Sequence, residues 1–267
     1  MSISEKLVLL NQDIESAEAK IIEKGGTVTN NGSSNLADNI DTIPTGSGES
    51  ALYYSRNQIQ IAYDVILPET LVFDAGNLRP GTNYYVSIRG FFTGVNVEKC
   101  ENLKHIILKG QLGTAESFIN NNLRELIDID LTETDTSKFI SYYNAFQNGN
   151  LKSIFGELNF SGVTDSVSGI FNGCSNLEDV RFAENNLNRA ISLSSSSKLT
   201  TDSLVSIANG LVAGNYTLTL HATSKTNCNT IMGYVDNTKG YDVFVADESG
   251  TVTLSEFITV TKGWSLA

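Results

Sequence analysis

Hydrophobic residues recur every three or four positions over the first 21 residues. Their spacing of 4, 3, 4, 3 and 4 is that of a coiled-coil seam, and it predicts a helix that ends at Gly25-Gly26. An isolated helix of about 20 residues is marginal in water, so this seam needs a partner surface. The helix could pack on its own domain, self-associate as a trimer or dimer, or dock onto another protein. The seam residues are Ile3, Leu7, Leu10, Ile14, Ala17 and Ile21.

A Gly- and Ser-rich stretch from Pro44 to Ser50 follows a second short helix expected over Ser34 to Ile43. Such a composition is typical of a flexible linker. We therefore expect a helical leader over residues 1–45, used for oligomerisation or attachment. Irregular coils over residues 46–96 would cap a repeat domain over residues 97–267. Within 46–96, polar and apolar residues alternate as in strands over QIQIAYDVIL and NYYVSIRGFF, and LPETLVFDAGNL hints at a degenerate repeat.

The repeat is visible when VEKCENLKHIIL (97–108) is laid over FNGCSNLEDVRF (171–182). Cys100 then falls on Cys174, Leu103 on Leu177 and Ile106 on Val180, while FINNNLRELIDIDL (118–131) and FQNGNLKSIFGELNF (146–160) carry the same order of aromatic residue, Asn-rich turn, Leu and strand. One such unit cannot bury its own apolar face, so the units must stack, with Asn side chains satisfying the backbone of the turns. The predicted strand centres lie near Ile107, Asp130, Asn159 and Arg181.

Beyond Arg189 the pattern changes to strand plus helix. Apolar residues at helical spacing predict a helix in this part, and short alternating runs predict strands on either side of it. We expect Trp264 to plug a carboxy-terminal cap. The expected elements are a strand at Ile191–Leu193, a helix at Thr201–Val212, a strand at Thr217–His221, a helix over SKTNCNTIMGYVDNTKG ended by Gly240, and a strand at YDVFVA.

The phrase VSGIFNGCSNLEDVRF resembles the BspA-type leucine-rich repeat, whose signature is F-x-G-C-S-N-L-x-x-V-x-F. The resemblance implies an α+β fold in which the helical leader precedes a leucine-rich-repeat solenoid with strand-plus-helix units at its carboxy-terminal end. In that family the solenoid serves as a binding surface, typically in bacterial surface adhesins and in phage structural proteins.

Two further segments resemble parts of bacteriophage virion proteins. One is the leader LVLLNQDIESAEAKIIEKGGTVTNNGSSNLADNIDTIPTG, and the other is the ending TKGWSLA. Together these resemblances imply a non-enzymatic structural virion protein, made in the host cytoplasm without a signal peptide, that acts as a tail or baseplate fibre binding a host receptor. A head-attached fibre or capsid decoration protein, a bacterial cell-surface adhesin and a polysaccharide depolymerase are the alternatives.

Composition and charge narrow the partners. Eighteen Lys and Arg against 30 Asp and Glu give a net charge of −12, which disfavours nucleic acid. No apolar run approaches a membrane span or a signal segment, so the sequence predicts a soluble chain without membrane insertion that begins near Met1. The expected partners are other virion proteins through the amino-terminal helix, further copies of this chain, and a host surface protein or glycan.

Catalytic and metal chemistry find no specific support in the sequence. Three separated cysteines and two histidines, His105 and His221, match no metal-ligand spacing, and no nucleophile, phosphate or dinucleotide motif is present. The acidic stretch at Asp128, Asp130, Glu133 and Asp135 fails as a calcium loop, because Phe139 stands where a bidentate Glu is needed. Calcium held between subunits stays open; otherwise no metal, cofactor or catalytic residue is expected.

Adjacent tyrosines are the candidates for recognition. In an extended chain one member of each pair must face away from the core. Tyrosine offers large, rigid contact area and stacks on sugars. The candidate recognition surface is Tyr84, Tyr85, Tyr142 and Tyr143, with Tyr53-Tyr54 as a further pair; covering of repeat edges is the other explanation. The matched positions of Cys100 and Cys174 predict small core residues.

Overall fold

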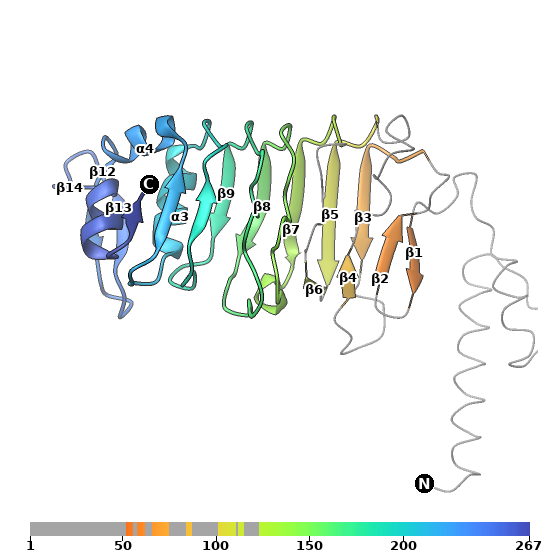
Figure 1. Ribbon diagram of the computed structural model, residues 1–267, viewed down its shortest axis with the longest axis horizontal. Coiled ribbons are helices and arrows are strands. Elements are labelled where there is room, and N and C mark those ends of the chain that lie inside the picture. The colour runs from red at the N-terminus through yellow and green to blue at the C-terminus, as the bar shows by residue number, and fades with distance from the viewer. Residues whose placement is uncertain are drawn as a thin grey trace, which may run out of the picture. The chain divides into compact units, whose positions relative to one another are not determined.

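The computed structural model of the protein describes residues 52–55, 58–61, 66–74, 84–86, 101–110, 112–114 and 123–267 (Figure 1). All of them belong to one unit, Ala51–Ala267. The expected leader over residues 1–45, its helical seam and Cys100 lie outside the described residues.

A five-stranded sheet dominates this unit, and all of its strand pairs are parallel. Neighbouring strands follow one another in chain order, side by side, as Figure 1 shows. The expected cap at 46–96 and the repeat domain at 97–267 both supply strands to this one sheet. The strands are β3 (Thr70–Asp74), β5 (His105–Gly110), β7 (Asp128–Thr134), β8 (Ser153–Leu158) and β9 (Asp179–Phe182).

Alternation of apolar and polar residues explains the strands, because successive side chains point to opposite faces of a sheet. One inward row crosses the whole sheet in register and is fully buried: Leu71, Ile106, Ile129, Ile154 and Val180. A leucine just before each of these strands is also buried: Leu67, Leu103, Leu126, Leu151 and Leu177. The expected strands near Ile107, Asp130 and Arg181 are therefore confirmed.

The expected strand centre at Asn159 is wrong, because β8 ends one residue earlier at Leu158. A register shift between β8 and β9 falls at Gly156, whose φ of +86° is left-handed. Asn159 instead begins a turn, where its Oδ1 accepts from the amide and hydroxyl of Ser161.

A second sheet contains β1 (Leu52–Ser55), β2 (Gln58–Ile61), β4 (Tyr84–Val86) and β6 (Leu112–Thr114). β1 pairs antiparallel with β2, whereas β2 pairs parallel with β4 and β4 parallel with β6. The alternating runs QIQI and YYV do form strands, as the sequence predicts.

Helix α3 (Thr201–Gly210) covers the edge of the long sheet at β9. The hydroxyls of Ser203 and Ser206 accept from the amides of Val180 and Phe182, each at 3.0 Å. An edge strand with unpaired amides invites pairing with another chain, and here helix hydroxyls satisfy these two. The helix begins at Thr200, whose side chain accepts from the Ser203 amide.

A further parallel sheet has three short strands, one before α3 in the chain and two after it: β10 (Ile191–Leu193), β11 (Thr217–Leu220) and β15 (Ser265–Leu266). The predicted strand, helix and strand over residues 191–221 are confirmed within two residues of their ends. Trp264, immediately before β15, is 2% exposed, and its Nε1 donates to the Val212 carbonyl at 2.7 Å. The prediction that it fills the interior of this end is confirmed.

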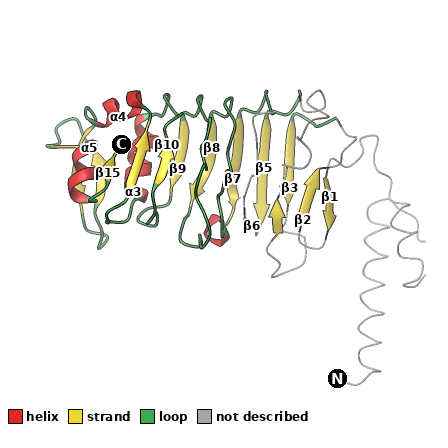
Figure 2. Ribbon diagram, in the orientation of Figure 1, coloured by secondary structure: helices red, strands yellow, loops and turns green. Residues whose placement is uncertain are grey.

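The expected long helix ending at Gly240 is wrong. Helix α4 (Ala222–Cys228) is short, and β12 (Met232–Asp236) follows, paired with β13 (Val243–Ala246) and β14 (Val252–Thr253). Gly233 explains the change, because a Cβ there would lie 2.3 Å from the Val245 carbonyl oxygen, so the bare backbone lets the strands approach. After β14 the chain passes through α5 (Leu254–Glu256; Figure 2) and then η4 (Phe257–Thr261) to reach β15.

Aromatic rings join the repeats inside the core. Phe160 packs 4.9 Å from Phe182, and Phe182 lies 6.2 Å from Phe171. Tyr142 is fully buried between Phe139 and Phe160. Within the described part of the chain, no helix has the length and hydrophobicity needed to cross a membrane.

Candidate functional site

The outward face of the five-stranded sheet presents side chains in aligned rows. One row runs from Val72 through Ile107 and Asp130 to Phe155, each paired with the next across the strands. Phe155 is 47% exposed and Val72 38% exposed. Large apolar side chains on an exposed sheet face are the groups that a partner surface can cover.

A polar row borders these apolar residues. His105 Nδ1 lies 2.8 Å from Asp128 Oδ2, on the neighbouring strand. Lys109 Nζ donates to Glu133 Oε1 at 2.6 Å, again from β5 to β7. Pairs of opposite charge across adjacent strands stabilise their register modestly. His105 thus has a structural contact, with the neighbouring strand.

The acidic stretch at residues 128–135 does not converge on one point. Asp130 accepts from the amide and hydroxyl of Thr132, and Asp135 accepts from those of Ser137. Asp128 and Glu133 face their basic partners on β5. Over the described residues, no group of three or more His, Cys, Asp or Glu side chains is arranged to hold a metal ion.

The predicted recognition tyrosines separate into three cases. Tyr142 is 0% exposed, so its place in a recognition surface is wrong: its ring fills the core, and its hydroxyl donates to the Asn159 carbonyl at 3.3 Å. Burial accordingly raises its pKa above the usual range. Tyr143 is 38% exposed, which confirms that one member of this pair faces outward. Tyr84 and Tyr85 lie in β4, and their side chains are outside the described residues.

The two described cysteines and His221 make contacts that stabilise the fold. The Cys174 thiol is buried and donates to the Phe146 carbonyl, and burial raises its pKa to about 12. Burial also raises the pKa of Cys228 to about 12. His221 precedes α4 and accepts from the Thr223 amide at 3.2 Å. Both cysteines are free thiols.

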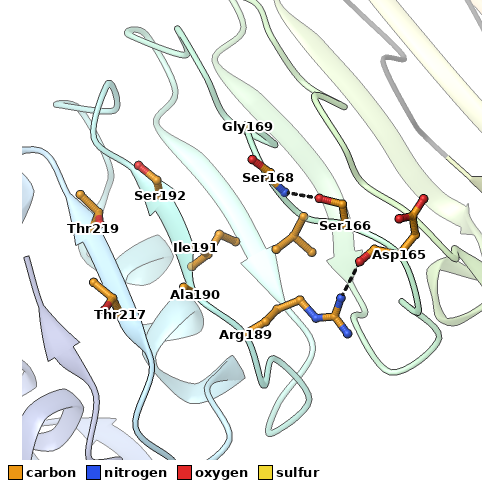
Figure 3. A pocket seen from close by; sticks show the side chains of 11 residues that line it. Asp165, Ser166, Ser168, Gly169, Arg189, Ala190, Ile191, Ser192, Thr217 and Thr219 are labelled. Atoms are coloured by element: carbon orange, nitrogen blue, oxygen red, sulfur yellow. Dashed lines mark hydrogen bonds between the residues drawn. The ribbon is translucent and has the colours of Figure 1, made fainter.

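Besides the long sheet, neighbouring loop segments are also joined by backbone hydrogen bonds, and this hydrogen bonding is interrupted at one place among the described residues. Segments 140–146 and 164–170 are joined by backbone hydrogen bonds from Tyr142 to Ser166 and from Asn144 to Ser168. Between 164–170 and β10, the described structure shows no backbone hydrogen bond. The Arg189 side chain bridges there instead. It donates to the Val163 carbonyl at 2.7 Å and to the Asp165 carbonyl at 3.1 Å, the second of which Figure 3 shows.

A pocket of about 380 Å³ lies at this interruption. Its two sides come from segment 165–169 and from β10 with β11, as Figure 3 shows. Most of its polar lining consists of hydroxyl groups, beside the one guanidinium. The hydroxyl-bearing residues are Ser166, Ser168, Ser192, Thr217 and Thr219.

Sequence reasoning missed both Phe155 and this pocket. Alternation along β8 could have predicted that Phe155 is exposed, because the apolar Ile154 and Leu158 face inward and Phe155 lies on the opposite face. No sequence signal marks the pocket, since Arg189 and Val163 are 26 residues apart and meet only in the folded chain. Comparison of the chain with protein-family models, with curated proteins and with solved structures finds no match.

Proposed function

We propose that the chain is a non-enzymatic structural protein of a bacteriophage virion, a tail or baseplate fibre that displays a binding surface to its host. In this proposal residues 70–182 are leucine-rich repeats of the BspA type, each contributing one strand to a solenoid. The parallel sheet in chain order, with a buried leucine before several strands, supports the repeat assignment. The amino-terminal seam supplies attachment to the particle or to further copies of the chain.

The outward face of the long sheet is the observation on which the binding role rests. Strand pairing fixes its side chains in rows, so a partner meets a surface whose groups are already positioned. Preorganised groups lose little conformational entropy on binding, and buried aromatic anchors contribute much of the energy at interfaces. Phe155, on β8, is an aromatic group exposed on this face.

The test combines localisation with binding. Antibody labelling of purified particles should place the chain on a tail or baseplate, and labelled full-length chain should bind host cells. Phe155→Ala should weaken cell binding about tenfold or more while leaving thermal unfolding nearly unchanged. Tyr234→Ala is the matched control, because Tyr234 is 48% exposed on β12 and lies outside the long sheet.

Absence of the chain from particles would refute the virion role. Equal cell binding by the Phe155→Ala and wild-type chains would refute the role of the sheet face. Release of reducing sugar from host polysaccharide by the purified chain would instead favour a depolymerase.

A further inference from the structure

The pocket beside Arg189 has an excess of hydrogen-bond donors. Trans peptide units hold their C=O and N–H on opposite sides, and the described residues contain no cis peptide. Ser166 O accepts from Tyr142, so the Val167 N–H, in the same peptide unit, points away from segment 140–146 and toward β10. The same argument aims the Gly169 N–H toward the pocket side, since Ser168 O accepts from Asn144.

These two amides have no protein acceptor within the described structure. The neighbouring carbonyls, in contrast, are occupied: Val163 and Asp165 accept from Arg189, and Val167 accepts from the Ile170 amide. Segment 164–170 therefore offers two amide donors to the pocket side.

The charge at the pocket favours an anionic acceptor. Two neutral carbonyls hold Arg189, and among the described residues no carboxylate forms a hydrogen bond with it, so its positive charge is not compensated there by direct contact. The Asp165 carboxylate lines the rim but is exposed, where solvent and salt screen it. Guanidinium groups bind carboxylates with paired, directional hydrogen bonds.

The hydroxyl lining indicates what the rest of the ligand is. The side-chain hydroxyls of Thr217 and Thr219 have no hydrogen-bond partner in the described structure. Hydroxyls of this kind donate and accept, as the hydroxyls of a sugar ring do. The volume of about 380 Å³ falls at the small end of ligand pockets, sufficient for one sugar residue.

We infer that this pocket binds an acidic sugar residue, with its carboxylate on Arg189 and the amides of Val167 and Gly169 and its ring hydroxyls on Thr217 and Thr219. The inference deepens the proposed function and rests on it in one respect: the sugar would belong to a host surface glycan. The binding chemistry itself stands on the pocket alone.

Sodium glucuronate is the probe, and glucose is its neutral counterpart with the same ring. Titration of the full-length chain, followed by amide NMR, should give a dissociation constant on the order of 1 mM for glucuronate. Shifts should concentrate at Val167, Gly169 and Ser192. Glucose should bind at least about tenfold more weakly, because it lacks the charged acceptor.

Three variants locate the site. Arg189→Lys keeps the positive charge and one donor for the carbonyls, but it lacks the paired N–H donors of a guanidinium group. It should weaken glucuronate binding about fivefold or more. The double variant Thr217→Val with Thr219→Val removes two hydroxyls at constant shape and should weaken binding several-fold. Thr70→Val, an exposed threonine of β3, is the matched control and should leave binding unchanged.

Equal affinity for glucose and glucuronate, or the absence of binding, overturns the inference. Shifts away from the pocket do so as well. Inorganic phosphate binding as tightly as glucuronate would reduce the site to a simple anion site and overturn the sugar assignment. The two proposals can fail separately. If the chain is absent from virions but binds glucuronate, only the virion role is refuted. If the threonine double variant binds host cells as well as wild type does, the pocket is not the site of host binding, and the virion role is unaffected.

Discussion

One glycine, Gly156, decides the local geometry of the long sheet, and a small substitution can test it. Gly156 produces the register shift in β8 with a φ of +86°. A Cβ at this position would lie 2.9 Å from the Leu131 carbonyl carbon, which belongs to the backbone of the neighbouring strand and cannot move alone. The bulge and the outward direction of Phe155 therefore depend on the absence of a side chain.

Gly156→Ala should lower the free energy of unfolding by about 3 kcal/mol or more, the sum of a left-handed backbone cost and an overpacking cost. Gly240→Ala is the matched control, because Gly240 has a φ of +82° and nothing within 4 Å of the added Cβ. It should cost about 1–2 kcal/mol. Urea unfolding of both variants measures the difference, and equal losses would mean that the contact with Leu131 relaxes freely.

Cys174 gives a prediction whose sign changes with pH. Cys174→Ser should cost about 1–2 kcal/mol at neutral pH, because a smaller and more polar group replaces a fully buried thiol. The folded pKa of the thiol is raised to about 12, so its contribution to stability is present below the unfolded pKa of about 8.5 and is lost as the pH rises toward 12. At about pH 10 the advantage of the wild type should have shrunk by about 2 kcal/mol.

Denaturant unfolding at the two pH values checks this, and a difference that stays constant would contradict it. Peptide-resolved alkylation provides the second measurement: Cys174 should react only on unfolding, since the thiolate is the nucleophile. Finding the native cysteine already oxidised would contradict the packing role.

At the scale of secondary-structure elements, the sequence predicts the strands and helices whose hydrophobic pattern lies within a short stretch of chain. The strands β5, β7 and β9 follow from alternation with a preceding leucine, and α3 follows from apolar residues at helical spacing. The helix predicted to extend to Gly240 fails because Gly233 and the β13 strand are matched only in three dimensions. The pocket is missed for the same reason, since Arg189 replaces backbone pairing between segments distant in sequence.

The turn before β8 tests the predicted role of asparagine. Asn148 is 1% exposed, donates to the Leu123 carbonyl at 2.8 Å and accepts from the amides of Asn150 and Leu151. It thus joins two repeats and holds its own bend, which confirms that asparagine side chains satisfy the turns. Asn148→Ala should cost about 2–4 kcal/mol, because buried backbone groups of two repeats lose their partners.

Asn172→Ala is the control for this substitution, because Asn172 is an exposed turn residue of a later repeat. It should change the free energy of unfolding by less than about 0.5 kcal/mol. Similar losses in the two variants would show that asparagine acts through turn propensity and not through the bonds between repeats.

At the scale of the whole molecule, we expect the two parts of the chain to be stabilised in different ways. Residues 51–267 form one unit with a continuous buried core, so this part has the burial needed for stability. The amino-terminal seam lies outside the described residues, and its apolar stripe requires burial by a surface that the sequence does not specify. Separating the two parts by deletion therefore separates attachment from folding.

Deletion of Ser2 to Gly26 should lower the oligomeric state or abolish attachment to the particle, while the circular dichroism and unfolding of the remaining chain stay close to wild type. The reason is that the seam alternates with the spacing of a coiled coil, and packing of such a seam is what holds a helix of this length together. Light scattering measures the mass, and cosedimentation with particles measures attachment. Leu7→Ser with Leu10→Ser should reproduce the deletion, whereas Gln12→Ser, at a polar position of the same helix, should not. An unchanged mass together with unchanged attachment in the deletion would show that the predicted helix packs on its own domain, the remaining arrangement that the sequence allows.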